Sequence, residues 1–118
     1  VLLHVICDAL FGARAMGDIG AHFPDTDPAF KGIDSKLLLR ETVSKVCTEG
    51  WGVVNVDATI CLEKPKLRPH IDDMRRCIAG LLNITEDRVG VKATTTERLG
   101  FVGTGEGISA HAVVLLSR

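Results

Sequence analysis

The chain has 118 residues, of which 46% are hydrophobic and 25% are charged, and its formal net charge at pH 7 is -1. This length and composition predict one globular domain with a hydrophobic core over residues 1–118. A surface that binds duplex DNA or an anionic membrane usually carries an excess of basic residues, so the balanced charge argues against nucleic acid and membrane partners.

No stretch of the sequence reaches the roughly eighteen apolar residues that a membrane span needs. The cysteines form no C-x-x-C pair and fall at apolar positions, which predicts buried, reduced thiols at Cys7, Cys47, Cys61 and Cys77 and a reducing compartment. The sequence begins inside an amphipathic pattern and without methionine, so we expect it to lack an N-terminal segment of a longer protein.

Two helices are predicted in the first half. Apolar residues recur at helical spacing over residues 1–16, which places His4 and Asp8 together on the opposite face. A second helix begins at Asp34 or Ser35 as its N-cap and ends at Gly50. Its apolar stripe is expected to contain Leu39, Val43, Val46 and Cys47.

The second half alternates strands with one helix. Apolar and polar residues alternate over residues 54–62, which is typical of a half-buried strand. A third helix opens at Pro69, a short turn begins at residues 85–87, and further strands are expected over residues 89–93 and 108–116. This order predicts an α/β (α+β) sandwich, in which helices cover one face of a small sheet.

The last strand is apolar on both faces. Val113 and Leu115 alternate with Ala112, Val114 and Leu116, so the sheet face away from the helices also has to be buried. In a chain this short, packing of sheets around a symmetry axis would bury it, and we expect an oligomer.

The loop over residues 17–32 is acidic and rich in Gly and Pro. Its carboxylates Asp18, Asp25 and Asp27 can accept hydrogen bonds from sugar hydroxyls, and with the aromatic Phe23 and Phe30 they indicate a carbohydrate or nucleotide site. An Asx-type turn at residues 25–28 explains the same pattern without a ligand.

Two further segments suit a nucleotide. Residues 63–69 form a stiff loop with two prolines and three cations, whose backbone can read a base edge, although a solvated connection is the ordinary alternative. Residues 92–101 place three threonine hydroxyls and the carboxylate of Glu97 after a strand, which suits phosphate and a divalent cation. A helix N-cap at Thr95 or Thr96 is the alternative.

In order and spacing, these loops resemble the 2-C-methyl-D-erythritol 2,4-cyclodiphosphate synthase family. The resemblance covers essentially the whole chain. The blocks that carry it are Gly17-Asp18-Ile19-Gly20, Phe23-Pro24-Asp25-Thr26-Asp27-Pro28, Pro65-Lys66, Pro69-His70-Ile71, Lys92-Ala93-Thr94-Thr95-Thr96-Glu97 and Gly105-Glu106-Gly107.

The resemblance implies a small mixed β-sheet covered on one face by helices, with the sheets of a homotrimer packed around a threefold axis and active sites between subunits. It implies a phosphorus-oxygen lyase of non-mevalonate isoprenoid biosynthesis, in bacterial cytoplasm or a plastid-type organelle. By resemblance, the expected substrate is 4-diphosphocytidyl-2-C-methyl-D-erythritol 2-phosphate, whose 2-phosphate would attack the β-phosphorus and release CMP. Zinc and magnesium or manganese are the implied cofactors.

The resemblance also assigns residues. His4 corresponds to a zinc ligand whose ring Asp8 would orient, Glu97 to a ligand of magnesium or manganese, and Thr95 and Glu97 to catalytic positions. The implied substrate-binding residues are Asp18, Ile19, Gly20, Phe23, Pro24, Asp25, Thr26, Asp27, Leu62, Glu63, Lys64, Pro65, Lys66, Leu67, Arg68, Thr94, Thr95, Thr96, Glu97, Phe101 and Thr104.

The sequence departs from the family pattern in two places. The family's Asp-x-His pair, which supplies the other zinc ligands, belongs upstream of Val1, so we expect this chain alone to turn over little. Thr104 stands where bacterial relatives commonly carry Arg, which puts the pairing of Glu106 in doubt. The alternative function is a non-catalytic trimeric module that binds cytidine nucleotides. No metal role is expected for His22, His70 or His111.

Overall fold

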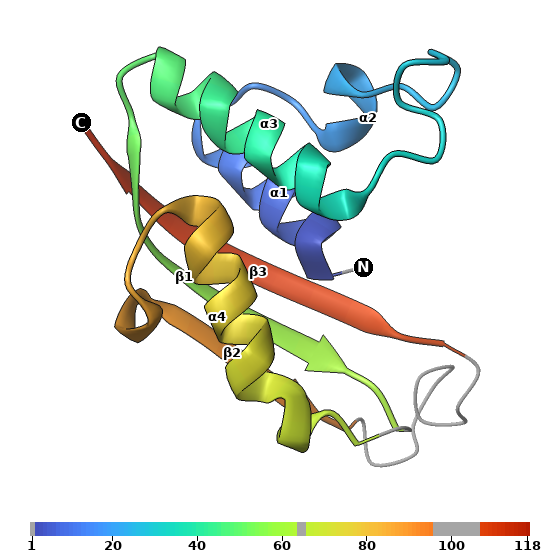
Figure 1. The fold of residues 1–118 in the computed structure, drawn as a ribbon, viewed down its shortest axis with the longest axis vertical. Coiled ribbons are helices and arrows are strands. Elements are labelled where there is room, and N and C mark those ends of the chain that lie inside the picture. Colours follow the sequence, from blue (N-terminus) through green and yellow to red (C-terminus); the bar gives the residue numbers. More distant parts are fainter. Residues whose placement is uncertain (1, 64–65, 96–106) are drawn as a thin grey trace.

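The computed structural model describes residues 2–63, 66–95 and 107–118 (Figure 1). Within these ranges no helix is both long enough and apolar enough to cross a membrane. The elements in chain order are α1 (Leu2–Ala13), α2 (Ile19–His22), α3 (Ser35–Thr48), β1 (Gly52–Cys61), the 3-10 turn η1 (Arg68–His70), α4 (Ile71–Leu82), the 3-10 turn η2 (Glu86–Arg88), β2 (Val89–Thr94) and β3 (Ser109–Ser117).

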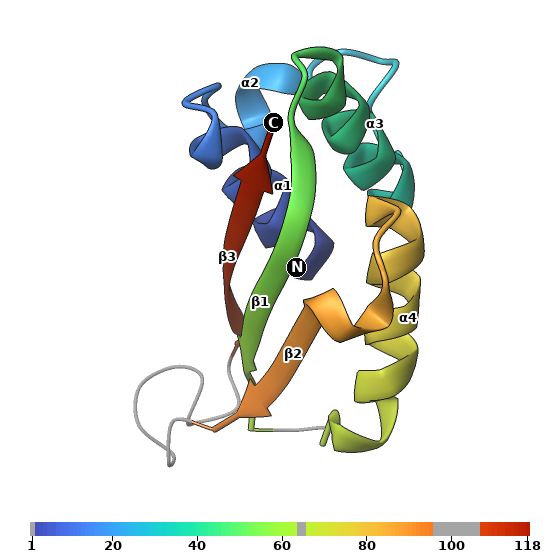
Figure 2. The same ribbon diagram turned by 90° about the vertical axis from the view of Figure 1, so that its left-hand side faces the viewer.

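The strands form a mixed sheet in the order β2-β1-β3. β1 runs parallel to β2, with Val56 opposite Val89, and antiparallel to β3, with Val56 opposite Val114. The parallel pair is joined by a crossover through α4. Figure 2 shows α1, α3 and α4 on the same side of the sheet. The α+β fold and the coverage of one face are therefore as predicted from the alternation of elements.

The core lies between this sheet face and the helices. β1 turns Val56, Ala58 and Ile60 inward, and β2 adds Val89 and Val91. The fully buried side chains of the helical layer are Ile6, Cys7, Leu10, Phe11, Leu39, Thr42, Val46 and Ile78. Alternation of period two in the strands and helical spacing in α1, α3 and α4 bring these residues to one interior.

The outer face of the sheet is apolar along β3, as predicted. Val113 is 72% exposed and Leu115 is 58% exposed. On the neighbouring strands, an ion pair joins Lys92 to Asp57, and Asp57 lies opposite Val113 in the ladder. In the described part of one chain, this face has no helix over it (Figure 2).

The predicted apolar stripe of α3 is only partly right. Val46 and Leu39 are buried, but Cys47 is exposed, because it follows Val46 by one residue and points about 100° around the helix. Thr42 takes an interior position instead, and its hydroxyl donates a hydrogen bond of 2.8 Å to the carbonyl of Leu38. That bond removes the cost of burying the hydroxyl.

The prediction of four buried thiols is correct only for Cys7. Cys47 is exposed, and Cys61 and Cys77 are partly exposed. Burial, which disfavours the thiolate, raises the pKa of the Cys7 thiol above its ordinary value of 9.0. Cys7 is therefore a core side chain, and Cys47 is the thiol open to solvent.

Alkaline pH is expected to destabilise the fold through Cys7. With its pKa raised in the folded state, the folded chain keeps this proton at a pH where the unfolded chain loses it. Above about pH 9 the free energy of unfolding should fall by up to about 1.4 kcal/mol per pH unit, until the folded pKa is reached. Urea unfolding from pH 7.5 to 10.5 measures this slope, which Cys7→Ala should reduce and Cys47→Ala should not. Equal slopes in all three chains would contradict the prediction.

The indole of Trp51 contacts two guanidinium groups near the ends of three elements, α1, α3 and β3. The guanidinium carbon of Arg14, just after α1, lies 4.4 Å from the Trp51 ring centroid, and that of Arg118 lies 4.8 Å from it. Arg14 also lies 3.5 Å from a carboxylate oxygen of Glu49, beyond α3. The contacts tie the ends of α1, α3 and β3 together at the edge of the core.

Arg14→Ala is expected to lower the free energy of unfolding by about 1–2 kcal/mol, because it removes a partly desolvated cation–π contact and its packing. Chemical denaturation monitored by Trp51 fluorescence measures the change. Arg40→Ala is the control, since Arg40 is an exposed arginine of α3. A loss in Arg14→Ala no larger than in this control would show that the contact contributes nothing to stability.

Candidate functional site

A hollow of about 540 Å³ lies where the parallel strands end. β1 ends at Cys61 and β2 at Thr94, which are partners in the ladder, and the Leu62 amide donates to the Thr94 carbonyl at 3.0 Å. Ligands of α/β sheets commonly bind at the carboxyl ends of parallel strands. The lining residues are Leu62, Glu63, Lys66, Arg68, Pro69, Ala93, Thr94 and Thr95.

This hollow unites two segments that the sequence assigned to one ligand. The predicted base-reading loop supplies residues 62, 63, 66 and 68, and the predicted phosphate segment supplies Thr94 and Thr95. Leu67, which was also predicted, is described but is not among the lining residues. The other predicted residues on this side of the site, Lys64, Pro65, Thr96, Glu97, Phe101 and Thr104, lie outside the described residues. The alternative prediction for this segment, a helix N-cap at Thr95 or Thr96, falls where the described residues stop, because Thr95 is described and Thr96 is not.

The turn η1, which precedes α4, supplies Arg68 and Pro69 to the lining of the hollow. Pro69 stands in the first turn of η1, where a missing backbone N–H costs no helical hydrogen bond, and the His70 amide donates to the Leu67 carbonyl at 2.8 Å. This turn leads directly into α4. Lys66 and Arg68 are exposed just before it, so two cations border the hollow at neutral pH.

The predicted metal residue His4 lies on the exposed face of α1, with Asp8 one turn later. The side chain hydrogen-bonded to the His4 ring is Ser35, with Oγ 3.1 Å from Nε2. Asp8 instead accepts a hydrogen bond of 2.7 Å from the amide of Ile19. The prediction that Asp8 orients the ring of His4 is therefore wrong, because Asp8 bonds to Ile19 and the ring of His4 bonds to Ser35.

The segment predicted as a loop over residues 17–32 contains the short helix α2. Asp18 is its N-cap and accepts from the Ala21 amide at 2.9 Å, and Gly17 supplies the left-handed backbone, with φ of 89°, that precedes it. Because Asp8 holds Ile19, the turn Asp18–Gly20 is fixed to α1. This segment was expected to contain no regular element, and that expectation was wrong.

In the rest of the segment, residues 23–32, a polar side chain hydrogen-bonds to the backbone of the segment itself. Asp27 accepts from the Ala29 amide at 2.9 Å, as in the Asx-type turn, whereas Asp25 is exposed. Phe23 is buried and meets the ring of Phe30 edge-on at 5.2 Å. The turn explanation is thus realised at Asp27, and Phe23 is a core residue at this loop.

His22 is a structural histidine whose partners no sequence pattern indicates. Its ring stacks on Phe11 at 4.0 Å, and Nε2 lies 2.7 Å from the Met16 carbonyl, so Nε2–H donates there. Nδ1 then accepts from the Lys45 ammonium at 3.3 Å. No role in metal binding was expected for His22, and these contacts use both of its nitrogens within the fold.

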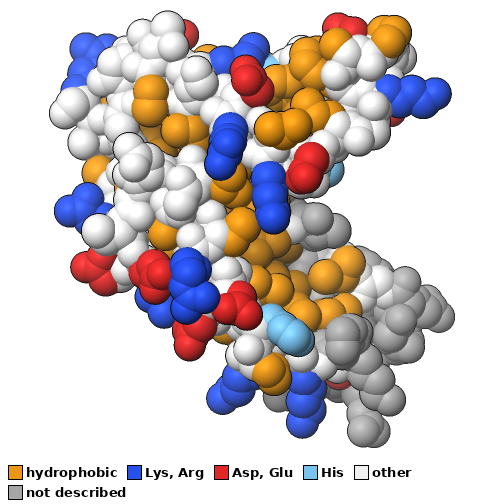
Figure 3. All heavy atoms as spheres, in the orientation of Figure 1, with side chains coloured by type: hydrophobic (Ala, Val, Ile, Leu, Met, Phe, Trp, Pro, Cys, Tyr) orange, Lys and Arg blue, Asp and Glu red, His pale blue; other side chains and the backbone are white. Residues whose placement is uncertain are grey.

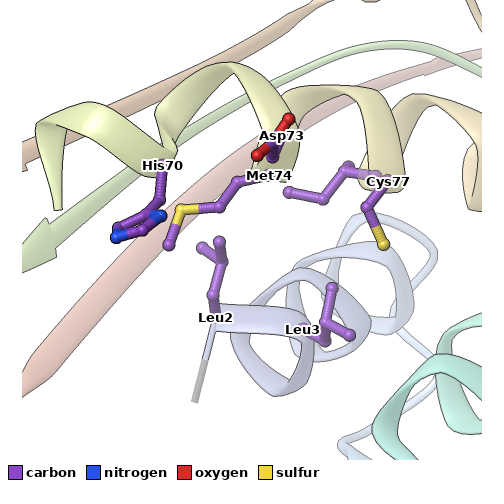
Figure 4. A pocket seen from close by; sticks show the side chains of 7 residues that line it. Leu2, Leu3, His70, Asp73, Met74 and Cys77 are labelled. Carbon is purple, nitrogen blue, oxygen red and sulfur yellow. The ribbon is translucent and has the colours of Figure 1, made fainter.

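A second, apolar hollow of about 310 Å³ separates the first turn of α1 from α4. Figure 4 shows Leu2 and Leu3 of α1 facing Met74 and Cys77 of α4, and Figure 3 shows hydrophobic side chains in the recess between the α1–α3 layer and α4. The lining residues are Leu2, Leu3, His70, Asp73, Met74, Cys77 and Ile78. It contains none of the residues predicted to bind substrate.

The donor set for the expected zinc is incomplete in this structure. Among the described residues, no group of three or more His, Cys, Asp or Glu side chains is placed to hold a metal ion. His4 presents an exposed imidazole that fits as one ligand, and one imidazole does not hold a catalytic zinc. The other predicted metal residue, Glu97, lies outside the described residues.

Comparison with known proteins decides the family. The YgbB family model matches residues 1–117. A protein of Trichlorobacter lovleyi named 2-C-methyl-D-erythritol 2,4-cyclodiphosphate synthase is 63% identical over 116 residues, which cover 98% of this chain and 74% of that protein. The chain belongs to the 2-C-methyl-D-erythritol 2,4-cyclodiphosphate synthase family. It is thus a member of an enzyme family of isoprenoid precursor biosynthesis.

Solved structures of the synthase family share the fold. The bifunctional IspDF from Campylobacter jejuni matches with a TM-score of 0.92 and 41% identity, over 97% of this chain and 31% of that one. A 2C-methyl-D-erythritol-2,4-cyclodiphosphate synthase in a form bound to CDP matches with a TM-score of 0.90 and 36% identity, over 98% of this chain and 74% of that one.

Proposed function

We propose that this chain carries the nucleotide-binding part of an active site that cyclises 4-diphosphocytidyl-2-C-methyl-D-erythritol 2-phosphate to 2-C-methyl-D-erythritol 2,4-cyclodiphosphate and releases CMP. The observation that carries the proposal is the hollow of about 540 Å³ at the carboxyl ends of β1 and β2, which joins the two predicted nucleotide segments. The fold match to a CDP-bound synthase supports a cytidine nucleotide as its ligand.

In this proposal, the loop after β1 binds cytosine through its backbone, and Thr94 and Thr95 donate hydrogen bonds to the diphosphate. Lys66 and Arg68 at the rim add positive charge for an anionic ligand. Both threonines are exposed, so their hydroxyls are accessible to a ligand. The lining thus offers polar groups for the base and for the diphosphate of such a nucleotide.

The proposed reaction needs no protein nucleophile. An oxygen of the 2-phosphate forms a bond to the β-phosphorus, and the bond from that phosphorus to the bridging oxygen breaks, so the electron pair leaves with CMP. The protein has to align the two phosphates and to neutralise the charge on the diphosphate, which are positioning and electrostatic contributions. This reaction is of the phosphorus-oxygen lyase class.

The proposed site is shared between subunits of a homotrimer. Asp18–Gly20 and Phe23–Asp27, which we assign to the ribose and the methylerythritol, are not among the residues that line the hollow. A neighbouring subunit can bring this segment to it. The uncovered apolar face of β3, with Val113 and Leu115, supplies a surface for such packing. The fold match to the synthases is consistent with this assembly.

We assign His4 as one zinc ligand and Glu97 as a ligand of magnesium or manganese. A metal bound there would neutralise phosphate charge and polarise the phosphorus–oxygen bonds. The remaining zinc ligands are expected in an Asp-x-His pair upstream of Val1. By itself this chain is therefore expected to bind nucleotide and to turn over little.

The decisive assay is CMP release from the diphosphocytidyl substrate with zinc and magnesium present. It compares this chain with a form extended at Val1 by the Asp-x-His-containing segment of a relative. We expect release only from the extended form, reduced at least tenfold by Thr95→Val and unchanged by Thr48→Val, which alters an exposed threonine of α3. If both forms bind CDP and neither releases CMP, the proposed enzymatic function is wrong and the trimeric binding module is favoured.

A further inference from the structure

Within the described part of the chain, the hydrogen-bond partner of the His4 ring belongs to a different helix. His4 lies in the first turn of α1, and Ser35 is the first residue of α3. The Ser35 Oγ lies 3.1 Å from Nε2 of His4, although the two residues are 31 positions apart in the chain. This contact links the exposed imidazole to the helix packed beside it, as the adjacent α1 and α3 in Figure 1 show.

The position of the Ser35 hydroxyl is set by a well-formed helix start. Asp34 is the N-cap of α3, with its carboxylate accepting from the Lys36 amide at 2.8 Å and its carbonyl from the Leu37 amide at 3.0 Å. Leu38 and Leu39 are buried directly after it. Ser35 is therefore held by a capped, packed first turn, so its hydroxyl is a fixed partner for the ring.

The partner of one ring nitrogen decides what the other can do. A neutral imidazole carries one N–H and one lone pair, and a metal takes the nitrogen with the lone pair. Histidines that bind metals almost always donate their other N–H to an oxygen atom. Asp8 shares the helix face but is engaged with the Ile19 amide at 2.7 Å. Ser35 is the oxygen within reach of Nε2.

We propose that Ser35 is a positioning residue that accepts a hydrogen bond from Nε2–H of His4 and thereby leaves the Nδ1 lone pair of that ring for the metal. The inference rests on the proposed function only in taking His4 as a metal ligand. Because His4 is exposed, loss of this contact frees both the ring rotamer and the tautomer. Loss of such a hydrogen bond typically lowers metal affinity by about 10–100-fold.

The first experiment reads the tautomer in the metal-free chain. Long-range ¹H–¹⁵N spectra of the His4 ring, recorded with the imidazole neutral, distinguish a proton on Nε2 from one on Nδ1. The chain as given and Ser35→Thr, which keeps a hydroxyl, are expected to hold the proton on Nε2, and Ser35→Ala to show a mixture. Ser44→Ala, which changes a second serine of α3, is the control. A proton on Nδ1 in the unaltered chain, or no change in Ser35→Ala, would overturn the proposal.

The second experiment measures zinc affinity by competition with a chelator, in the form extended by the Asp-x-His segment. Ser35→Ala should weaken zinc binding about 10–100-fold, and Ser35→Thr and Ser44→Ala should keep it. Equal affinity in Ser35→Ala, alongside a changed tautomer, would overturn the positioning role. Absence of zinc binding in the unaltered extended form would overturn the metal role of His4 and, with it, both the proposed function and this inference. The tautomer measurement needs no metal, so it distinguishes an error in the metal role of His4 from an error in the role of Ser35 alone.

Discussion

Replacing Phe11 by alanine is expected to lower the free energy of unfolding by about 3–5 kcal/mol. Phe11 is 0% exposed, stacks on His22 at 4.0 Å and lies 6.1 Å from the Phe23 ring centroid. Removing the ring leaves a cavity between α1 and the segment after α2, because the partners are held by hydrogen bonds and cannot close around it. The loss includes the aromatic contacts as well as buried area.

Urea unfolding followed by circular dichroism measures this effect. Leu37→Ala is a matched truncation at a residue of α3 that is 50% exposed, and it should cost no more than about 0.5 kcal/mol. Phe11→Leu should cost less than Phe11→Ala, because it refills part of the volume. A loss in Phe11→Ala as small as that in the exposed control would mean that the cluster of Phe11, His22 and Phe23 does not stabilise the fold.

Replacing Asp8 by alanine is expected to weaken CDP binding about tenfold, which corresponds to ~1.4 kcal/mol. The carboxylate of Asp8 holds the Ile19 amide at 2.7 Å and so fixes the turn that carries Asp18 to α1. In the proposed site this turn contacts the ribose. Without the bond, the turn has to be ordered when the nucleotide binds, and that ordering reduces affinity.

Two measurements separate this effect from simple destabilisation. Calorimetric titration with CDP gives the affinity, and amide hydrogen exchange gives the protection of Ile19. Asp8→Ala should lower both, Asp8→Asn should lower them less because an acceptor oxygen remains, and Glu41→Gln, at an exposed carboxylate of α3, should change neither. Lost protection at Ile19 with unchanged CDP affinity would show that the turn does not contribute to the nucleotide site.

Most of the fold could be predicted from periodicity. The alternation over β1, the helices α1 and α4, and the β-strand before residue 95 all appear in the structure close to where they were predicted. The exceptions are local. α2 has only four residues, including a glycine, and is held by the side chains of Asp18 and Asp8 rather than by helix propensity. Thr42 enters the core because a backbone carbonyl satisfies its hydroxyl, which no apolar pattern indicates.

The candidate site also has one part that the sequence predicts and another that it does not. The meeting of residues 62–68 with Thr94 and Thr95 follows from two parallel strands that end at one sheet edge, so the sequence pattern contains it. The contacts of Ser35 with His4 and of Asp8 with Ile19 depend on how α1 is rotated against its neighbours. Hydrophobic spacing fixes such a rotation only to within a few tens of degrees, which is too coarse to select a hydrogen-bond partner.

The first helix of the chain packs against its last strand. β3 also pairs along the whole of β1, from Gly52 opposite Ser117 to Cys61 opposite Ser109. During synthesis from the N-terminus, α1 and both other strands therefore emerge before the element that covers them. Contacts this distant in sequence close late and slow the folding of small domains. The nascent chain is thus expected to expose the part of α1 that packs against β3 until residues 109–117 have left the ribosome, whereas α3, which also packs against α1, is made earlier.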